Sequence, residues 1–178
     1  GIDCDKSKAD CFQAVCPNAK FYDSIEDAER DGILRDIDVV SIATPPNFHV
    51  QYIKEVIRRD IGRIIFCEKP IVSVSNEVVE LRQLMGDFPN KKIVPNISRR
   101  WNSRIRMVTD LISSEGFGKV KKINIRYTRG IYNTGTHLFD LLKMWCGCSI
   151  DKVITLGKTQ TSAEPELSYS FYFIIFWC

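Results

Sequence analysis

The chain has 178 residues, of which 44% are hydrophobic and 26% charged, and its formal net charge is +3. This length suffices for one full domain or one and a half small ones, and the composition is ordinary for a globular fold. No apolar run approaches the roughly 18 residues of a membrane helix. The basic clusters at Arg99-Arg100 and at 119–122 are short, so a solvated face explains them better than nucleic-acid binding does. We therefore expect no membrane or nucleic-acid partner.

The seven cysteines and the chain ends bear on the cellular setting. The cysteine number is odd, and Cys146 and Cys148 lie one residue apart with no second close pair, which does not fit a zinc site. No secretory signal opens the chain. We expect a reduced, cytoplasmic protein without a metal site. Because the chain opens at Gly1 and closes within an apolar run at Cys178, we expect both ends to be cut.

The first 97 residues predict alternating strands and helices with short connections. Strands are expected over 1–3, 20–22, 38–43, 63–67 and 91–97, and helices over 5–15, 24–29, 48–59 and 75–86. Ser24 and Ser75 are candidate caps for two of these helices. The alternation predicts an α/β fold with a doubly wound, Rossmann-like parallel sheet.

Two strand ends carry polar residues. The apolar run 38–43 stops at Thr44-Pro45, and the run 64–67 stops at Glu68-Lys69-Pro70. Such runs are typical of buried parallel strands, and ligands bind at the carboxyl ends of these strands in open α/β sheets. We therefore expect one rim of the sheet to carry Thr44, Pro45, Asn47, His49, Glu68 and Lys69.

The pattern changes after residue 98. A helix is expected over 101–114 and another over 136–145, and the alternating segment 119–127 predicts an antiparallel strand with one wet face. Further strands are expected over 153–156 and 169–176. We therefore predict a partial dinucleotide-binding domain at 1–97, followed at 98–178 by part of an α+β domain with an open antiparallel sheet.

Several motifs occur together in a fixed order. They are Asp38 with Ala43-Thr44-Pro45 and His49, then Cys67-Glu68-Lys69-Pro70, Arg99-Arg100-Trp101, Gly116-Phe117-Gly118-Lys119-Val120, and Asn133-Thr134-Gly135-Thr136-His137-Leu138-Phe139-Asp140. In order and spacing the chain resembles the Gfo/Idh/MocA family, the glucose–fructose oxidoreductase and inositol dehydrogenase group, from Gly1 to about Gly147. The resemblance implies a nicotinamide-binding Rossmann domain, a substrate domain with an open sheet, and hydride transfer on sugars, sugar nucleotides or cyclitols. It also implies a homo-oligomer that forms through the exposed sheet face.

One departure from the family concerns the phosphate site. The family opens with a strand and a Gly-x-Gly-x-x-Gly turn, where helix amides hold the pyrophosphate. That turn and the later strands of the second sheet are absent from this sequence. We therefore expect a fragment or a shortened relative. If nothing supplies the first strand, the sheet keeps an open edge and cofactor binding is weakened.

Lys69 and His137 are the leading catalytic candidates. An ammonium at Lys69 can stabilise developing alkoxide charge, or it can simply close the strand and pair with Glu68. From the sequence alone His137 is more simply a satisfied core histidine, but the family places its catalytic histidine there, and an imidazole can take the hydroxyl proton. Asp140 shares a helix face with His137 and either orients the site or stabilises a buried network.

Three further residues are candidates for contact with substrate. Asn133 cannot act as a base, so it would hold substrate hydroxyls, which leaves proton transfer to His137 and Lys69. Arg100 either touches a substrate phosphate or carboxylate or forms a salt bridge at the domain boundary. Tyr132 either flanks the sugar or lies on the surface.

The cofactor residues follow from the Rossmann layout. Asp3 ends a strand that would present an acid to the adenosine ribose, unless it caps the following helix. This favours NAD over NADP, although nearby Lys6 and Lys8 temper the preference. Thr44, Pro45, Asn47 and Glu68-Lys69 would line the nicotinamide side, and His49 is better explained as a buttress of the following helix than as a chemical group.

The favoured function is an NAD(P)-dependent sugar or cyclitol dehydrogenase. A non-catalytic binding or regulatory protein, or an inactive fragment, is the second interpretation, because the phosphate turn is absent. An NAD-dependent glycosidase is the third. Titration with NAD and release of a free sugar without net NADH would distinguish them.

Overall fold

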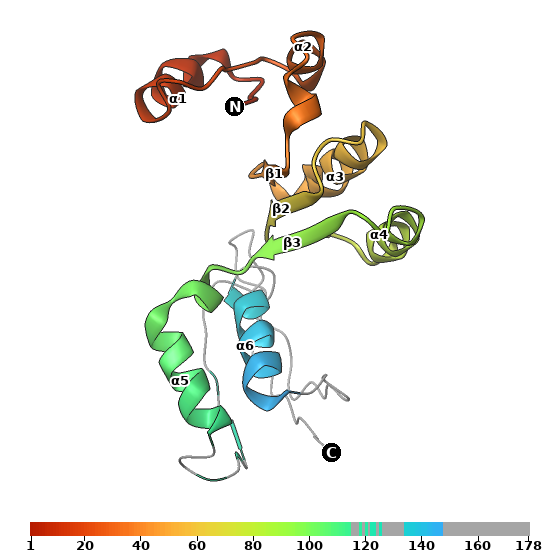
Figure 1. The fold of residues 1–178 in the computed structure, drawn as a ribbon. Helices are drawn as coiled ribbons and strands as arrows, with labels where there is room; N and C mark the ends of the chain where they lie inside the picture. The colour runs from red at the N-terminus through yellow and green to blue at the C-terminus, as the bar shows by residue number, and fades with distance from the viewer. Residues whose placement is uncertain (115–117, 119, 121, 124, 126–133, 148–178) are drawn as a thin grey trace, which may run out of the picture. The chain divides into compact units, whose positions relative to one another are not determined.

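The computed structural model describes residues 1–114, 118, 120, 122–123, 125 and 134–147 (Figure 1). The chain divides into two compact units. The first comprises 1–67 and 74–94, and the second comprises 68–73 and the chain from residue 95 onward. The segment with Glu68 and Lys69 thus belongs to the second unit, although it interrupts the first in sequence. Within the described ranges no helix has both the length and the apolar character needed to cross a membrane.

A three-stranded sheet follows the order β1-β2-β3. Its strands are β1 (Val39–Ile42), β2 (Ile64–Glu68) and β3 (Lys92–Asn96). β1 and β2 run parallel, with Val39 opposite Ile64 and Ile42 opposite Cys67. β-branched side chains favour these strands, and a parallel pair requires a long crossover, which contains α3 (His49–Arg58). The expected strands over 38–43, 63–67 and 91–97 are confirmed to within a residue or two, whereas those over 1–3 and 20–22 are reduced to one parallel bridge between Ile2 and Tyr22.

The core of the first unit lies between α3 and the sheet. The buried apolar residues of α3 recur every three or four positions and are Val50, Ile53, Val56 and Ile57. The helix packs on β1, whose Ile42 is buried, and the β2 side chains of Ile65 and Cys67 are fully buried. Burying one such aliphatic side chain stabilises a fold by about 1.5–3 kcal/mol.

The other face of the strand pair is less buried than the sequence predicts. Val39 is 52% exposed and its register partner Ile64 is 37% exposed. Burial on both faces is therefore wrong for these two positions. The physical reason is the period of two along a strand, which turns Ile65 and Cys67 toward the core and Ile64 away from it.

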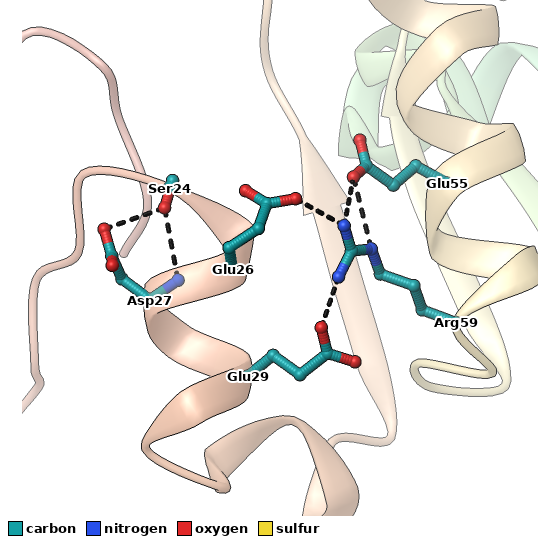
Figure 2. Close-up of polar contacts among 6 residues, drawn as sticks. All are labelled: Ser24, Glu26, Asp27, Glu29, Glu55 and Arg59. Atoms are coloured by element: carbon teal, nitrogen blue, oxygen red, sulfur yellow. Dashed lines mark hydrogen bonds and ion pairs between the residues drawn. The ribbon is translucent and has the colours of Figure 1, made fainter.

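An arginine joins α2 (Ile25–Arg30) to α3 (Figure 2). Arg59 follows α3 directly, and its guanidinium contacts the carboxylates of Glu26 and Glu29 on α2 and of Glu55 on α3. Its Nη2 lies 3.0 Å from the Glu55 carboxylate. The predicted cap of α2 is confirmed, because the backbone N–H of Asp27 donates to the Ser24 hydroxyl at 3.1 Å.

The loop between α3 and β2 is closed by a buried lysine. The Nζ of Lys91 donates to the Gly62 carbonyl at 2.5 Å and lies 2.6 Å from the Asp60 carboxylate. Gly62 has φ 59°, and a Cβ there would lie 3.1 Å from the Asp38 carbonyl oxygen, so the tight turn requires glycine.

α4 (Ser75–Asp87) begins one residue earlier than the sequence predicts. Val74 occupies the capping position, so Ser75 is the first helical residue and not the cap. The Glu77 carboxylate instead accepts from the backbone N–H of Val74 at 3.2 Å. The carboxylate in the first turn satisfies a donor that the helix leaves unpaired.

The described part of the second unit includes the α-helices α5 and α6 (Figure 1). α5 (Ser103–Ser113) is capped by Asn102, and α6 (Thr136–Cys146) ends at Gly147 with φ 65°. The helices pack together, and the Trp145 indole donates to the Thr109 hydroxyl at 3.1 Å. The expected strand over 119–127 lies largely outside the described residues, and those over 153–156 and 169–176 lie entirely outside. The assignment of domains at 1–97 and 98–178 stays a prediction.

Candidate active site

The strand ends of β2 and β3 bring Glu68 and Asn96 together in the second unit. Each is the last residue of its strand, and the Asn96 amide donates to the Glu68 carboxylate at 2.5 Å. Lys69 follows Glu68, and the Lys69–Pro70 peptide is cis. Proline has no N–H to extend the ladder, so β2 stops here. Lys69 is thereby held beside an anchored carboxylate.

His137 lies in the first turn of α6. The helix buries Leu141 and Leu142 on its packed side. The His137 Nδ1 is also buried and has no hydrogen-bond partner among the residues that the structure describes. A satisfied core histidine would have such a partner. His137 Nδ1 is therefore not satisfied by the described residues, and the choice between a core and a catalytic histidine stays a prediction.

The charges around His137 favour its neutral form. Burial lowers the pKa of the imidazole below the ordinary 6.5, and the cations of Lys69 and Arg99 lower it further, against the opposing effect of Asp140 and Glu68. The Lys69 charge thus acts on the His137 ring although the residues are far apart in sequence. An imidazole that stays unprotonated at neutral pH can accept a proton.

Asp140 is bound by Arg100. The guanidinium Nε and Nη2 each lie 2.6 Å from an Asp140 oxygen, in a bidentate pair that raises the pKa of Arg100. The Asp140 side chain is only 10% exposed, whereas that of Arg100 is 46% exposed. This agrees with the salt-bridge interpretation of Arg100, and the role of Asp140, in orienting the site or in stabilising a buried network, stays a prediction. Contact of Arg100 with substrate stays a prediction.

Sequence reasoning missed Arg99 and Asn96. Arg99 lies in the 3-10 turn Ser98–Trp101 and contributes to the field on His137. The signal for Asn96 was available, because it ends a strand next to the one that ends at Glu68. Arg99 and Arg100 could not be distinguished from the sequence, since only the turn decides which guanidinium reaches Asp140. Tyr132 and Asn133 lie outside the described residues.

In the first unit, Asp3 directly follows Ile2, which forms an isolated parallel bridge with Tyr22. One carboxylate oxygen accepts from the Asp5 backbone N–H at 2.9 Å, and the other pairs with the Lys8 Nζ at 2.9 Å. The pKa of Asp3 is lowered, first by the Asp5 N–H and then by Lys8. The expected helix over 5–15 divides into the 3-10 turn Lys6–Lys8 and α1 (Ala9–Val15), and Asp5 caps the turn. Asp5 therefore caps the turn, and the lowered pKa of Asp3 favours its ionised form, while its contact with a ribose stays a prediction.

The loop after β1 contains a second polar atom with no partner. The Thr44 Oγ1 is buried and has no hydrogen bond within the described part of the chain. His49 is fully buried at the start of α3, and its Nε2 donates to the Thr44 carbonyl at 2.7 Å. This agrees with the buttressing role expected of His49. Pro45 and Asn47 are exposed beside it.

A groove of about 640 Å³ lies between α3 and α4 in the first unit. Its lining includes Asn47, Gln51 and Lys54 from the α3 side and Glu77 and Glu80 from α4. Mixed charges line it, and Lys54 pairs with Glu80 across it. Neither Lys69 nor His137 is part of this groove, so its volume does not locate the chemistry.

Comparison with protein families identifies the chain. The model of the GFO_IDH_MocA group, described as an oxidoreductase family with an NAD-binding Rossmann fold, matches residues 2–90, half of the chain. The chain belongs to this family. The match confirms the resemblance, the Rossmann fold class and NAD as the family's cofactor.

Curated relatives of this Gfo/Idh/MocA chain include inositol 2-dehydrogenases. That of Pseudarthrobacter chlorophenolicus is 25% identical over 174 residues, which cover 91% of this chain and 50% of the relative. That of Rhizobium meliloti is 32% identical over 90 residues, which cover 51% of this chain and 26% of the relative. The chain thus spans about half the length of the curated relatives it matches.

Solved structures share the fold. Scyllo-inositol dehydrogenase from Lactobacillus casei, with bound NAD(H) and scyllo-inositol, aligns with a TM-score of 0.68 at 21% identity over 88% of this chain and 51% of that chain. The WlbA dehydrogenase from Thermus thermophilus, in complex with NAD and UDP-GlcNAcA, aligns with a TM-score of 0.65 at 21% identity, over 89% and 57%. At this identity the likeness supports the fold alone.

Proposed function

We propose that the protein is an NAD-dependent oxidoreductase that oxidises a secondary hydroxyl of a cyclitol or related sugar. Family membership supports the cofactor and the reaction class. The names of the inositol 2-dehydrogenase relatives and the scyllo-inositol bound to the Lactobacillus casei enzyme support the substrate class. Sugar nucleotides are the second substrate class, supported by the ligand of the Thermus thermophilus relative.

The environment of His137 is the observation that carries the proposal. Alcohol oxidation needs a base to remove the hydroxyl proton. The buried, unpartnered Nδ1 and the lowered pKa of His137 suit this role. Lys69 would donate to the same oxygen and stabilise its developing negative charge. Asp140, held by Arg100, would orient the helix turn that carries His137.

The cofactor residues of the first unit fit a dinucleotide. The Asp3 carboxylate is ionised and partly exposed, which suits a ribose hydroxyl, and the unsatisfied Thr44 Oγ1 suits a polar ligand atom. Pro45, Asn47 and the Glu68-Lys69 segment complete the proposed set. When bound, NAD would supply the hydride acceptor. His49 would act through the Thr44 carbonyl that it holds.

The remaining assignments complete the proposal. Asn133 and Tyr132 would contact substrate hydroxyls, with Asn133 as a positioning group. Residues 1–97 would form the cofactor domain and 98–178 the substrate domain. Self-association through the second-domain sheet is part of the proposal, and sedimentation of the protein tests it directly.

Replacement of Lys69 tests the mechanism. We expect Lys69→Ala to lower kcat for NADH formation from myo- or scyllo-inositol by about 10²–10⁴-fold, since both the donor and its field on His137 are lost. Lys92→Ala is the matched control, because Lys92 is an exposed lysine on β3. Unchanged turnover in Lys69→Ala would remove this residue from the mechanism.

The same assays separate the other functions. Binding of NAD, seen by calorimetry, without turnover of any cyclitol or sugar would favour a regulatory protein. Release of a free sugar from a glycoside without net NADH would favour the glycosidase. Absence of NAD binding by the protein from its complete reading frame would contradict the dehydrogenase and the glycosidase and favour the non-catalytic interpretation.

A further inference from the structure

The Asp3 carboxylate is already compensated by a cation. The Lys8 Nζ lies 2.9 Å from one oxygen of Asp3, and the Asp5 N–H lies 2.9 Å from the other. An acid in this position accepts from the 2′-hydroxyl of the NAD ribose and repels the 2′-phosphate of NADP. With Lys8 attached, the charges of Lys8 and Asp3 offset each other, so the repulsion of a phosphate by Asp3 is reduced.

The turn that carries Lys8 is built so that this lysine and not its neighbour reaches Asp3. Asp5 caps the 3-10 turn Lys6–Lys8 and accepts from both the N–H and the hydroxyl of Ser7. Lys6 leaves on another side of the turn and pairs with Asp23 at 2.6 Å. The two lysines therefore have separate partners, and Lys8 is the one directed to the predicted ribose site.

The Lys8–Asp3 pair can exchange partners. The Lys8 side chain is 58% exposed and that of Asp3 is 34% exposed, so water screens the pair and its separation costs little. A phosphate dianion offers an ammonium a stronger charge-assisted hydrogen bond than a screened carboxylate does. Lys8 can thus remain paired with Asp3 when the bound ribose has a 2′-hydroxyl. It can pair with the phosphate instead when the ribose has a 2′-phosphate.

We propose that Lys8 makes this chain accept NADP as well as NAD. The inference rests on the proposed function, and specifically on Asp3 facing the adenosine ribose. It assigns to Lys8 a role in cofactor choice, whereas an acid at this position alone would predict preference for NAD.

Dissociation constants for the two nucleotides test the proposal without any turnover. They are measured by calorimetry on the protein from its complete reading frame, in the wild type, Lys8→Met and Lys8→Arg. We expect wild-type affinities for NAD and NADP to lie within about tenfold of each other. Lys8→Met should raise the dissociation constant for NADP by about tenfold or more and change that for NAD by less than about threefold. Lys8→Arg should restore the affinity for NADP. Lys6→Met is the control and should leave both constants unchanged.

Each other outcome counts against the proposal. A wild-type NADP constant more than about a hundredfold above that of NAD would overturn it, as would equal effects of Lys8→Met on both nucleotides. A dissociation constant for NAD that neither Lys8→Met nor Asp3→Asn changes would overturn the placement of Asp3 at the adenosine ribose. It would leave the proposed function intact. Failure of the wild type to bind either nucleotide would overturn both. Thermal melts confirm folding, and the exposure of Lys8 predicts that its variants fold.

Discussion

At the scale of single residues, His137 combines an unsatisfied buried nitrogen with a cationic neighbourhood. Its Nδ1 is buried without a partner in the described chain, and two cations, Lys69 and Arg99, favour its neutral form. Burying an unpaired polar atom costs stability, so folding alone does not explain it. The proposed role in catalysis would explain it.

The lowered pKa of His137 predicts the pH dependence of the reaction. The acid limb of the kcat/KM profile for alcohol oxidation should fall below pH 6.5, the ordinary value for histidine, because the base stays unprotonated to lower pH. Lys69→Met should move that limb upward, since it removes a cation that lowers the pKa. A limb above pH 6.5 in the wild type, or one that Lys69→Met does not move, would contradict this assignment.

The lowered pKa of His137 also makes the stability of the fold depend on pH. Above pH 6.5 the ring is neutral in both the folded and unfolded states and has no effect. Below pH 6.5 the unfolded chain binds a proton that the folded protein resists, so the free energy of unfolding should decrease as the pH falls. His137→Gln should remove this component of the acid sensitivity in chemical denaturation.

At the scale of elements, the contact between α2 and α3 depends on one guanidinium. Arg59 gathers three carboxylates, Glu26, Glu29 and Glu55, around a side chain that is only 25% exposed (Figure 2). A network of this kind exceeds an isolated surface pair, because removing the cation leaves three like charges facing one another.

Arg59→Met should therefore lower the free energy of unfolding by about 1–2 kcal/mol, measured by urea denaturation. Methionine keeps most of the apolar stem, so the loss reports the charge. Arg30→Met is the control, because Arg30 forms an exposed pair with Asp27 inside α2, and a much smaller change is expected there. Adding Glu26→Gln should partly restore the Arg59→Met variant. Equal losses in the free energy of unfolding for Arg59→Met and Arg30→Met would contradict a stabilising network around Arg59.

Local sequence signals predicted the elements well where packing agrees with them. The apolar spacing in α3, the Ser24 cap and the Gly147 stop all match the structure, because each depends on neighbours within one turn. In α5 the apolar spacing places Val108 and Leu111 on one side of the helix, yet they are 38% and 41% exposed. An amphipathic pattern reports that a helix has an apolar side, and its neighbours decide how much of that side is covered.

At the scale of the whole molecule, the candidate groups divide between the two units. Asp3, Thr44 and His49 belong to the first unit, and Glu68, Lys69, His137 and Asp140 belong to the second. The proposed cofactor contacts are therefore drawn mainly from the first, and the proposed chemistry from the second.

Saturating NAD should protect the protein from its complete reading frame against thermal unfolding. At a concentration of about 100 times the dissociation constant, the expected gain is about 2.7 kcal/mol. Hydrogen exchange should slow around Asp3 and the loop after β1, where the proposed contacts lie. Adenosine at the same concentration is the control. Protection confined to the second unit would contradict the placement of the dinucleotide.

The sequence by itself determined the α/β alternation, the family and the identity of the polar residues at the strand ends, because hydrophobic period, turn residues and motif order are written in the chain. Only the tertiary structure decided the pairings. It pairs Asp140 with Arg100, Asp3 with Lys8 and Asn96 with Glu68. It also places the cations of Lys69 and Arg99 near His137. The reason is that the strength of a charge interaction depends on distance and burial, and residues far apart in the chain acquire both only when the fold is complete.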